Sequence, residues 1–229
     1  MPSTPAPTEN RRLSSLFGNL ELVIVVLLGT VSVVTAYASF QAALYGSKMD
    51  AFYADSTRVT AEAESAYLEG NQQYVQDSAT VARLIELEIE AQSDDSALAA
   101  LAAEKLEAFT FVAVSDELAA AIAWSEAENA ADPDTYTPPQ NDDAYLESLF
   151  GTWSTLNDEA AEATANGDAA NSYGDRLTLN TVLFAVSLFL LGVAAVLQGR
   201  RAQYTLIGVS TVIFAVGLVL TASIPVVTL

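Results

Sequence analysis

The 229-residue sequence contains no cysteine and no histidine. The chain therefore has no thiol nucleophile, no disulfide, no imidazole base and few ways to bind zinc or iron. It also lacks the GxxxxGK[ST] and GxGxxG patterns of nucleotide sites, the GxSxG elbow of hydrolases and the HExxH zinc motif. These absences predict a protein that is not an enzyme, with no catalytic residue, no cofactor and no metal site.

Lysine occurs only twice, and acidic residues outnumber lysine and arginine by 29 to 9. Residues 45–176 hold 27 of the acids against five basic residues, which gives this region a net charge of −22. Because phosphate contacts need basic side chains, we expect no nucleic-acid partner. The acid excess indicates either adaptation to high salt or an ordinary acidic domain, and either surface would attract cations weakly.

Charge is absent from three long apolar runs that begin at Leu22, Leu177 and Tyr204, and we assign transmembrane helices to residues 21–44, 177–198 and 204–226. Each is a predominantly apolar stretch of roughly 21 to 23 residues, about 32–35 Å of helix, which matches a bilayer core. Among side-chain amides we expect only Asn180 to lie within a span. No span carries a charge at its centre, which disfavours a pump or secondary transporter.

Basic residues close to the span ends predict the orientation. These topology determinants are Arg11, Arg12, Arg200 and Arg201. They place a short tail (residues 1–20) and a basic turn (residues 199–203) in the cytoplasm. Residues 45–176 and the C-terminus at 227–229 would then lie outside a multi-pass plasma-membrane protein.

A cleaved signal peptide is the competing interpretation of the N-terminal region. Ala36-Tyr37-Ala38 resembles a cleavage site preceded by an apolar segment and by Arg11 and Arg12. However, apolar and small residues continue through Leu44, which is longer than a signal peptide requires. The sequence favours an uncleaved span.

Small residues recur at helical spacing within the spans, where they let neighbouring helices approach closely. We expect them to pack the three spans of one chain together, or alternatively to form the seam of an oligomer. The helix-packing candidates are Ser32, Thr35, Ala36, Ser39, Ala43, Gly217 and Thr221.

A heptad pattern follows the first span directly and predicts a helix that packs along a seam. The seam residues are Tyr45, Met49, Phe52, Val59, Ala63, Ala66 and Gly70. The pattern continues to about Gln92, so the first span and this segment would form one helix of about 70 residues, with Gly46 as a point of flexure. A tyrosine stripe beside the seam predicts a wide buried edge rather than a binding face.

Two shorter helices are predicted after residue 93. Asp95 belongs to a run of helix N-cap residues before the first, and Ser115 is the N-cap of the second. A proline-containing loop follows at residues 131–143, and a long helical pattern then leads from Ala144 into the second span. As core anchors we expect Phe109, Phe111, Trp124, Phe150 and Trp153.

These elements predict an all-α protein with three transmembrane helices. An antiparallel helical-bundle ectodomain is inserted between the first and second spans, and its outer helices are continuous with those spans. The acidic loop carries Asp132, Asp134, Asp142 and Asp143, which are oxygen ligands suited to Ca²⁺ or Mg²⁺. Their spacing is not that of an EF-hand, so we favour a solvated loop.

The stretch "TAYASFQAALYGSKMDAFYAD" and the C-terminal "YGDRLTLNTVLFAVSLFLLGVAAVLQGRR" resemble a group of uncharacterised prokaryotic three-span membrane proteins. In that group the first span commonly ends in a "TAWSSYQA"-like sequence followed by an Ala/Glu-rich helix. This chain departs from it with Ala38-Ser39-Phe40 and a more acidic middle region. The resemblance implies the three-span topology and no activity.

The pattern as a whole predicts a non-enzymatic membrane protein whose acidic ectodomain is an interaction or assembly module. Its partners would be the lipid bilayer and either further copies of itself or another membrane protein, to which it would be an accessory subunit. Two alternatives remain open. One is a sensor-like ectodomain that signals through a partner, and the other is a subunit of a small oligomeric cation channel.

Overall fold

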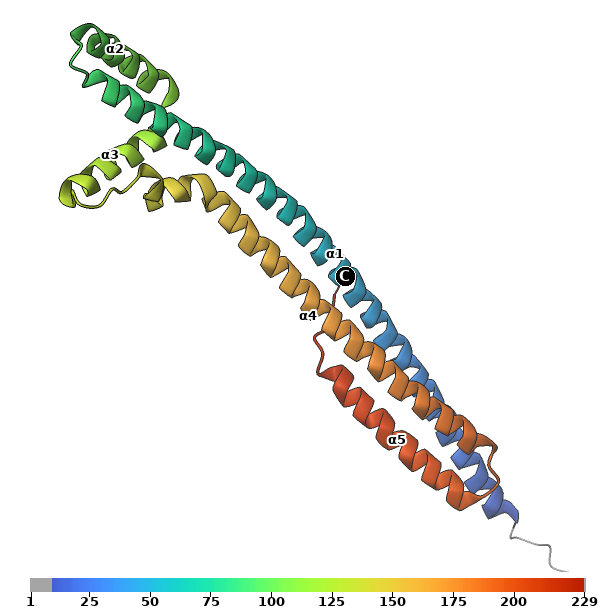
Figure 1. Cartoon of the computed structure of the whole chain (residues 1–229). Coiled ribbons are helices and arrows are strands. Elements are labelled where there is room, and N and C mark those ends of the chain that lie inside the picture. The colour runs from blue at the N-terminus through green and yellow to red at the C-terminus, as the bar shows by residue number, and fades with distance from the viewer. Residues whose placement is uncertain (1–9, 229) are drawn as a thin grey trace, which may run out of the picture. The chain divides into compact units, whose positions relative to one another are not determined.

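The computed structural model describes residues 10–228, with side chains from residue 20 onward. These residues form five α-helices and one short 3-10 helix (Figure 1). The elements in chain order are α1 (Asn10–Ala91), α2 (Ser96–Ala113), α3 (Asp116–Ala131), η1 (Pro139–Asn141), α4 (Asp143–Val196) and α5 (Arg200–Ala222). No β-strand occurs between residues 10 and 228, so the all-α prediction is confirmed for this part of the chain.

Three of these helices, α1, α4 and α5, are long and apolar enough to cross a membrane. Their apolar runs leave large side chains exposed, among them Leu22, Val182 and Val212. Water disfavours such surfaces on helices, whereas lipid does not. These helices are consistent with a multi-pass membrane protein.

α4 begins and ends close to the predicted limits, whereas α1 is longer than predicted and α5 differs at both ends. α1 is a single helix of 82 residues that passes through Gly46, and it contains both the first apolar run and the seam. Arg200 and Arg201 form the first turn of α5 rather than a separate basic turn. α5 ends at Ala222, before the predicted span end at residue 226, because Pro225 cannot continue a helix.

Side chains cap the two short helices as predicted. Asp95 accepts a hydrogen bond from the backbone N–H of Ala97 at 2.9 Å and begins α2. Ser115 accepts one from the N–H of Leu118 at 3.2 Å and begins α3. Both caps satisfy helix N–H groups that would otherwise lack partners.

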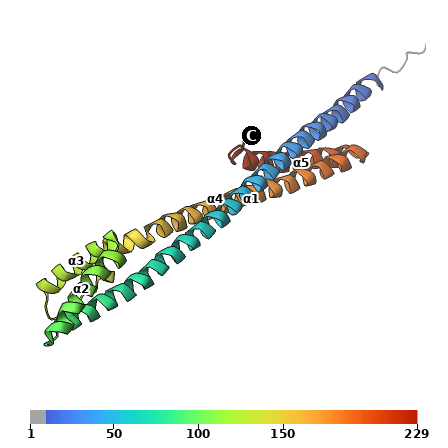
Figure 2. The same ribbon diagram turned by 90° about the horizontal axis from the view of Figure 1, so that it is seen from above.

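The chain divides into two compact units. The first unit, Met1–Tyr53 with Thr164–Leu229, contains the N-terminal part of α1, the C-terminal part of α4, and α5. In both views α5 lies alongside α4 (Figures 1 and 2). The core residues recur mostly at intervals of seven along α1 and α4, which is the periodicity of helices packed as a coiled coil. This core consists of Val31, Ala38, Tyr45, Ala170, Leu177, Phe184, Leu191, Ile224 and Val227.

The second unit, Ala54–Ala163, contains the remaining parts of α1 and α4 together with α2 and α3. Its small core comprises Val81, Leu118, Ala121 and Tyr145. The prediction that Phe111 is a core anchor is wrong, because its side chain is 90% exposed. Among the residues of α2, only Ala102 is fully buried, so most of this apolar helix remains uncovered.

Candidate functional site

Helices α4 and α5 are joined by buried polar contacts inside their apolar runs. The hydroxyl of Ser187 donates to the carbonyl oxygen of Ser210 at 2.9 Å, and the Ser210 hydroxyl donates to the Ser187 carbonyl at 2.8 Å. The two Oγ atoms lie 2.7 Å apart, and neither side chain is exposed. A small hydroxyl at each position lets the backbones approach closely enough for these bonds to form.

Two amide side chains extend this line of contacts between the same helices. Asn180 Nδ2 donates to Thr221 Oγ1 at 3.1 Å. Gln203 Nε2 donates to the carbonyl oxygen of Ala194 at 3.1 Å, close to the connection between the helices. α4 and α5 are therefore held together by hydrogen bonds at three levels, with no charged side chain involved.

Residues 224–227 follow α5 and form a strap that returns to α1. The Gln41 side chain forms two hydrogen bonds to Val227 in the strap. Its Oε1 accepts from the Val227 N–H at 3.0 Å, and its Nε2 donates to the Val227 carbonyl oxygen at 3.2 Å. Tyr45 adds a 2.7 Å hydrogen bond to the Pro225 carbonyl.

The expectation that Asn180 is the only amide within a span is wrong. Gln41 stands out in the first apolar run as an amide among apolar residues, and this signal was available from the sequence.

An apolar cavity of about 540 Å³ lies beneath the strap in the first unit. Its walls come from α1, α4, α5 and the strap itself, and they include Val33, Leu218 and Pro225. The lining also carries the polar side chains of Tyr37, Gln41 and Thr221, and the last two have hydrogen-bond partners within the chain. The mostly apolar lining suits an apolar chain.

The small-residue candidates fall into two groups. Gly217 and Thr221 are buried within the first unit, and a Cβ added to Gly217 would lie 2.6 Å from the Phe184 ring. Thr35 is half-buried. The remaining candidates are exposed on α1 and do not pack the helices of this chain: Ser32, Ala36, Ser39 and Ala43.

The seam residues are all buried or half-buried. In the first unit these are Tyr45, Met49 and Phe52, and the ring of Tyr45 lies 5.3 Å from that of Tyr173 on α4. In the second unit they are Val59, Ala63, Ala66 and Gly70. A Cβ added to Gly70 would overlap the backbone carbonyl oxygen of Leu149, so only glycine allows this close approach of α1 and α4.

A buried carboxylate marks the core of the second unit. Asp77 accepts hydrogen bonds from Tyr145 Oη at 2.7 Å and from Gln73 Nε2 at 2.7 Å. Burial, together with this hydrogen bond, raises the pKa of Tyr145 above its usual range. The pair satisfies two polar groups and links α1 to α4.

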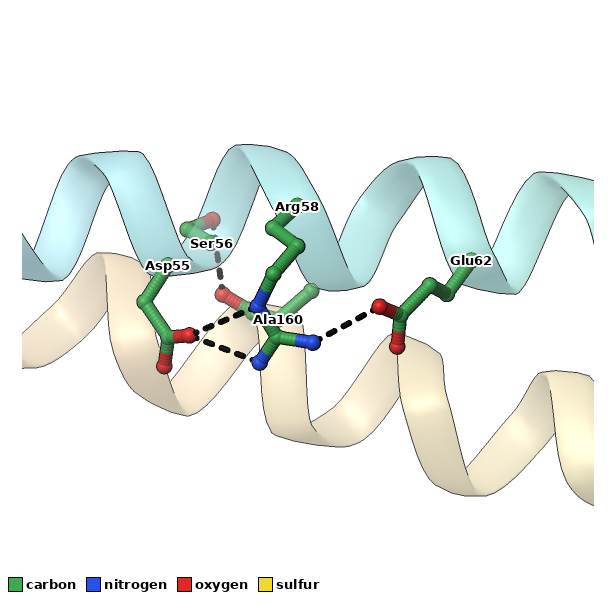
Figure 3. A network of polar contacts seen from close by, with 5 residues as sticks. All are labelled: Asp55, Ser56, Arg58, Glu62 and Ala160. Atoms are coloured by element: carbon green, nitrogen blue, oxygen red, sulfur yellow. Dashed lines mark hydrogen bonds and ion pairs between the residues drawn. The ribbon is translucent and has the colours of Figure 1, made fainter.

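A second link between these helices lies farther along the same unit (Figure 3). Ser56 Oγ donates to the Ala160 carbonyl oxygen at 3.0 Å. Beside it, Arg58 forms ion pairs with Asp55 and Glu62 on its own helix, at 2.8 Å and 2.7 Å. These exposed pairs contribute little to stability, whereas the Ser56 contact fixes the spacing of the two helices.

Two carboxylates of the acidic loop accept hydrogen bonds from backbone N–H groups two residues further along the chain. Asp132 accepts from the N–H of Asp134 at 3.3 Å, and Asp142 accepts from the N–H of Ala144 at 3.1 Å. Within residues 20–228, no group of three or more acidic side chains is placed to hold a metal ion. Of the topology determinants, Arg200 and Arg201 are exposed, and the side chains of Arg11 and Arg12 lie outside the described residues.

Exposed apolar side chains gather on the helices of the second unit near residues 85–112. α2 exposes Phe111 at 90% and Val112 at 82%, together with Leu98 and Leu101. Ile89, near the end of α1, is also exposed.

Comparison with protein-family models, curated proteins and solved structures gives no match.

Proposed function

We propose that this chain is a non-enzymatic integral membrane protein whose acidic helical segment is an interaction or assembly module. The observation that carries the proposal is the exposure of Phe111 and Val112 on α2. Burying an aromatic or branched side chain of this size stabilises a complex by about 1.5–3 kcal/mol. Large apolar side chains on an acidic, water-facing unit favour a protein partner that covers them.

The membrane placement in this proposal has two supports. The apolar helices α1, α4 and α5 supply three spans. The basic residues Arg11, Arg12, Arg200 and Arg201 then favour a cytoplasmic N-terminus and a cytoplasmic α4–α5 connection. Residues 45–176 and the C-terminus would lie outside the plasma membrane, with the helical segment inserted between the first two spans as an antiparallel bundle.

The contacts of the second unit favour a rigid framework of α1 and α4. Asp77 with Tyr145, and Ser56 with the Ala160 carbonyl, hold α1 and α4 at two levels of this unit. Helices that are already held in one conformation, such as α1 and α4, lose little entropy when a partner binds the unit. This suits an accessory subunit or a self-associating protein better than a segment that must move to signal.

The test compares a double variant with a matched control after extraction in mild detergent from native membranes. Phe111→Ser with Val112→Ser removes the proposed contact, and Val75→Ser, which alters a valine 60% exposed on α1, is the control. We expect wild type and control to run as a species heavier than one chain by native mass spectrometry, and the double variant to run as a monomer. A wild-type protein that is monodisperse and monomeric would overturn the proposal.

A further inference from the structure

Arg176 on α4 stands apart from the other arginines of the acidic region. Arg58 and Arg83 form ion pairs with carboxylates on their own helix. Among the described residues, no hydrogen bond or ion pair involves Arg176, although residues 45–176 carry 27 acids. Its guanidinium is therefore available to an anion from outside the chain.

The unpaired Arg176 lines a groove between α4 and α5 in the first unit. The groove has a volume of about 300 Å³ and is lined by Arg176, Leu179, Asn180, Leu220, Ser223 and Ile224. Its apolar walls are open to the surroundings, since Leu179 is 62% and Leu220 is 45% exposed. Its lining combines one cationic side chain and two polar ones, Asn180 and Ser223, with three apolar ones.

The position of the groove along the chain matches the boundary of a membrane. Arg176 is the last charged residue before the uncharged run at 177–198, so its guanidinium would lie at the level of lipid headgroups. Leu179 and Leu220 would lie on the hydrocarbon side of it. Along the membrane normal, a cation would thus be followed by apolar side chains. A phospholipid has the matching order, with a phosphate followed by an acyl chain.

We propose that this groove binds one membrane phospholipid. The Arg176 guanidinium pairs with the phosphate, for which its planar fork of donors is well matched, and one acyl chain lies along Leu179 and Leu220. Ser223 and Asn180 complete the lining of the groove. This site rests on the membrane placement proposed above and is independent of any protein partner of the second unit.

The experiment uses the full chain in neutral detergent with a phosphatidylglycerol that carries a photoreactive acyl chain. Labelled peptides, identified by mass spectrometry, should come from α4 around Leu179 and from α5 around Leu220. Arg176→Gln should reduce this labelling about fivefold at sub-saturating lipid, because one basic residue contributes about that factor to binding an anionic headgroup. Leu220→Trp, which fills the groove, should reduce it while Arg176 is intact.

Arg201→Gln is the matched control, since Arg201 does not line the groove. Its labelling of the groove peptides should equal that of wild type. Equal labelling by the corresponding diacylglycerol, full competition by soluble glycerol 3-phosphate, or unchanged labelling of Arg176→Gln would each overturn the lipid site. Release of the protein from membranes by alkaline carbonate would instead overturn the membrane placement, so the two failures are distinguishable.

Discussion

Ser187 on α4 and Ser210 on α5 hydrogen-bond to each other's backbone in both directions. Each hydroxyl donates to the carbonyl oxygen of the opposite serine, at 2.9 Å and 2.8 Å. Within lipid, polar contacts between helices contribute about 0.6 kcal/mol on average. This reciprocal pair therefore adds both stability and a fixed register to the two helices.

The serine pair predicts strong coupling between two substitutions. Ser187→Ala and Ser210→Ala should each lower the free energy of unfolding by about 0.5–1.5 kcal/mol. The double variant should lose less than the sum, because either single change already breaks the reciprocal arrangement. Reversible unfolding in mixed micelles measures this cycle, with exposed Ser39→Ala as the control. Additive losses would show that the two hydroxyls act independently.

Gly217→Ala should destabilise the packing of α5 against α4. Its Cβ would lie 2.6 Å from Phe184 Cε1, and overpacking of this kind costs about 1–3 kcal/mol. Gly208→Ala on the same helix has no atom within 4 Å and should be neutral or slightly stabilising. The midpoints of thermal unfolding compare the two variants. If Phe184→Leu does not restore stability to Gly217→Ala, the clash is not the cause.

Gln41→Leu should release the strap from α1. The substitution leaves the buried N–H and carbonyl of Val227 without their side-chain partner, which costs about 1–3 kcal/mol. Because the chain has no cysteine, Val227→Cys provides a single reporter thiol. Its labelling by a thiol reagent should become about tenfold faster in the Gln41→Leu background. Exposed Phe40→Leu should leave the labelling rate unchanged, and equal rates in all three proteins would contradict the role of these hydrogen bonds.

The buried Tyr145 predicts a loss of stability at alkaline pH. The unfolded chain releases the tyrosine proton near pH 10, whereas the raised pKa of Tyr145 keeps that proton on the folded protein at higher pH. The folded state then binds more protons, so the free energy of unfolding falls as pH rises above about 10.

Tyr145→Phe removes this pH-dependent term and also one hydrogen bond to Asp77. We expect a lower stability at pH 7, by about 1 kcal/mol, and a shallower alkaline decline. Exposed Tyr136→Phe should keep the wild-type pH profile. Circular dichroism melting between pH 7 and 11 is the measurement, and parallel profiles for Tyr145→Phe and wild type would refute the assignment.

Two glycines of α1 should respond in opposite ways to alanine. A Cβ added at Gly46 would meet no atom within 4 Å, so Gly46→Ala should stiffen the helix and stabilise it by up to about 1 kcal/mol, with membrane insertion unaffected. Gly70→Ala places its Cβ against the Leu149 backbone carbonyl, which cannot rotate away as a side chain can. We expect clear destabilisation by thermal melting. Similar melting temperatures for both variants would be inconsistent with the close approach at Gly70.

Much of the local structure follows from the sequence because its signals are local. The caps Asp95 and Ser115 lie where the spacing of polar and apolar residues places them. The heptad of α1 identifies the face that becomes buried, from Tyr45 to Gly70. The irregular backbone of the acidic loop can also be predicted, because prolines and aspartates are typical of such segments.

The predictions that were wrong concern contacts between residues far apart in the chain. Phe111 is apolar and has helical spacing, yet no other element covers it. Ser39 and Ala43 are spaced for close packing, yet they lie on the exposed side of α1, whereas Gly217 is buried against Phe184. Helical periodicity identifies which residues share a face but carries no information on which faces a neighbouring helix covers.

The sequence by itself determined the three apolar helices, the acidic region between the first two and the seam along α1. Each depends on composition or on periodicity within one segment, which the chemistry of the side chains sets locally. Only the tertiary structure decided that Gln41 holds Val227, that Ser187 meets Ser210 and that Arg176, with no partner among the described residues, lines a groove between α4 and α5. These relationships require segments distant in sequence to come together, and packing in three dimensions selects them.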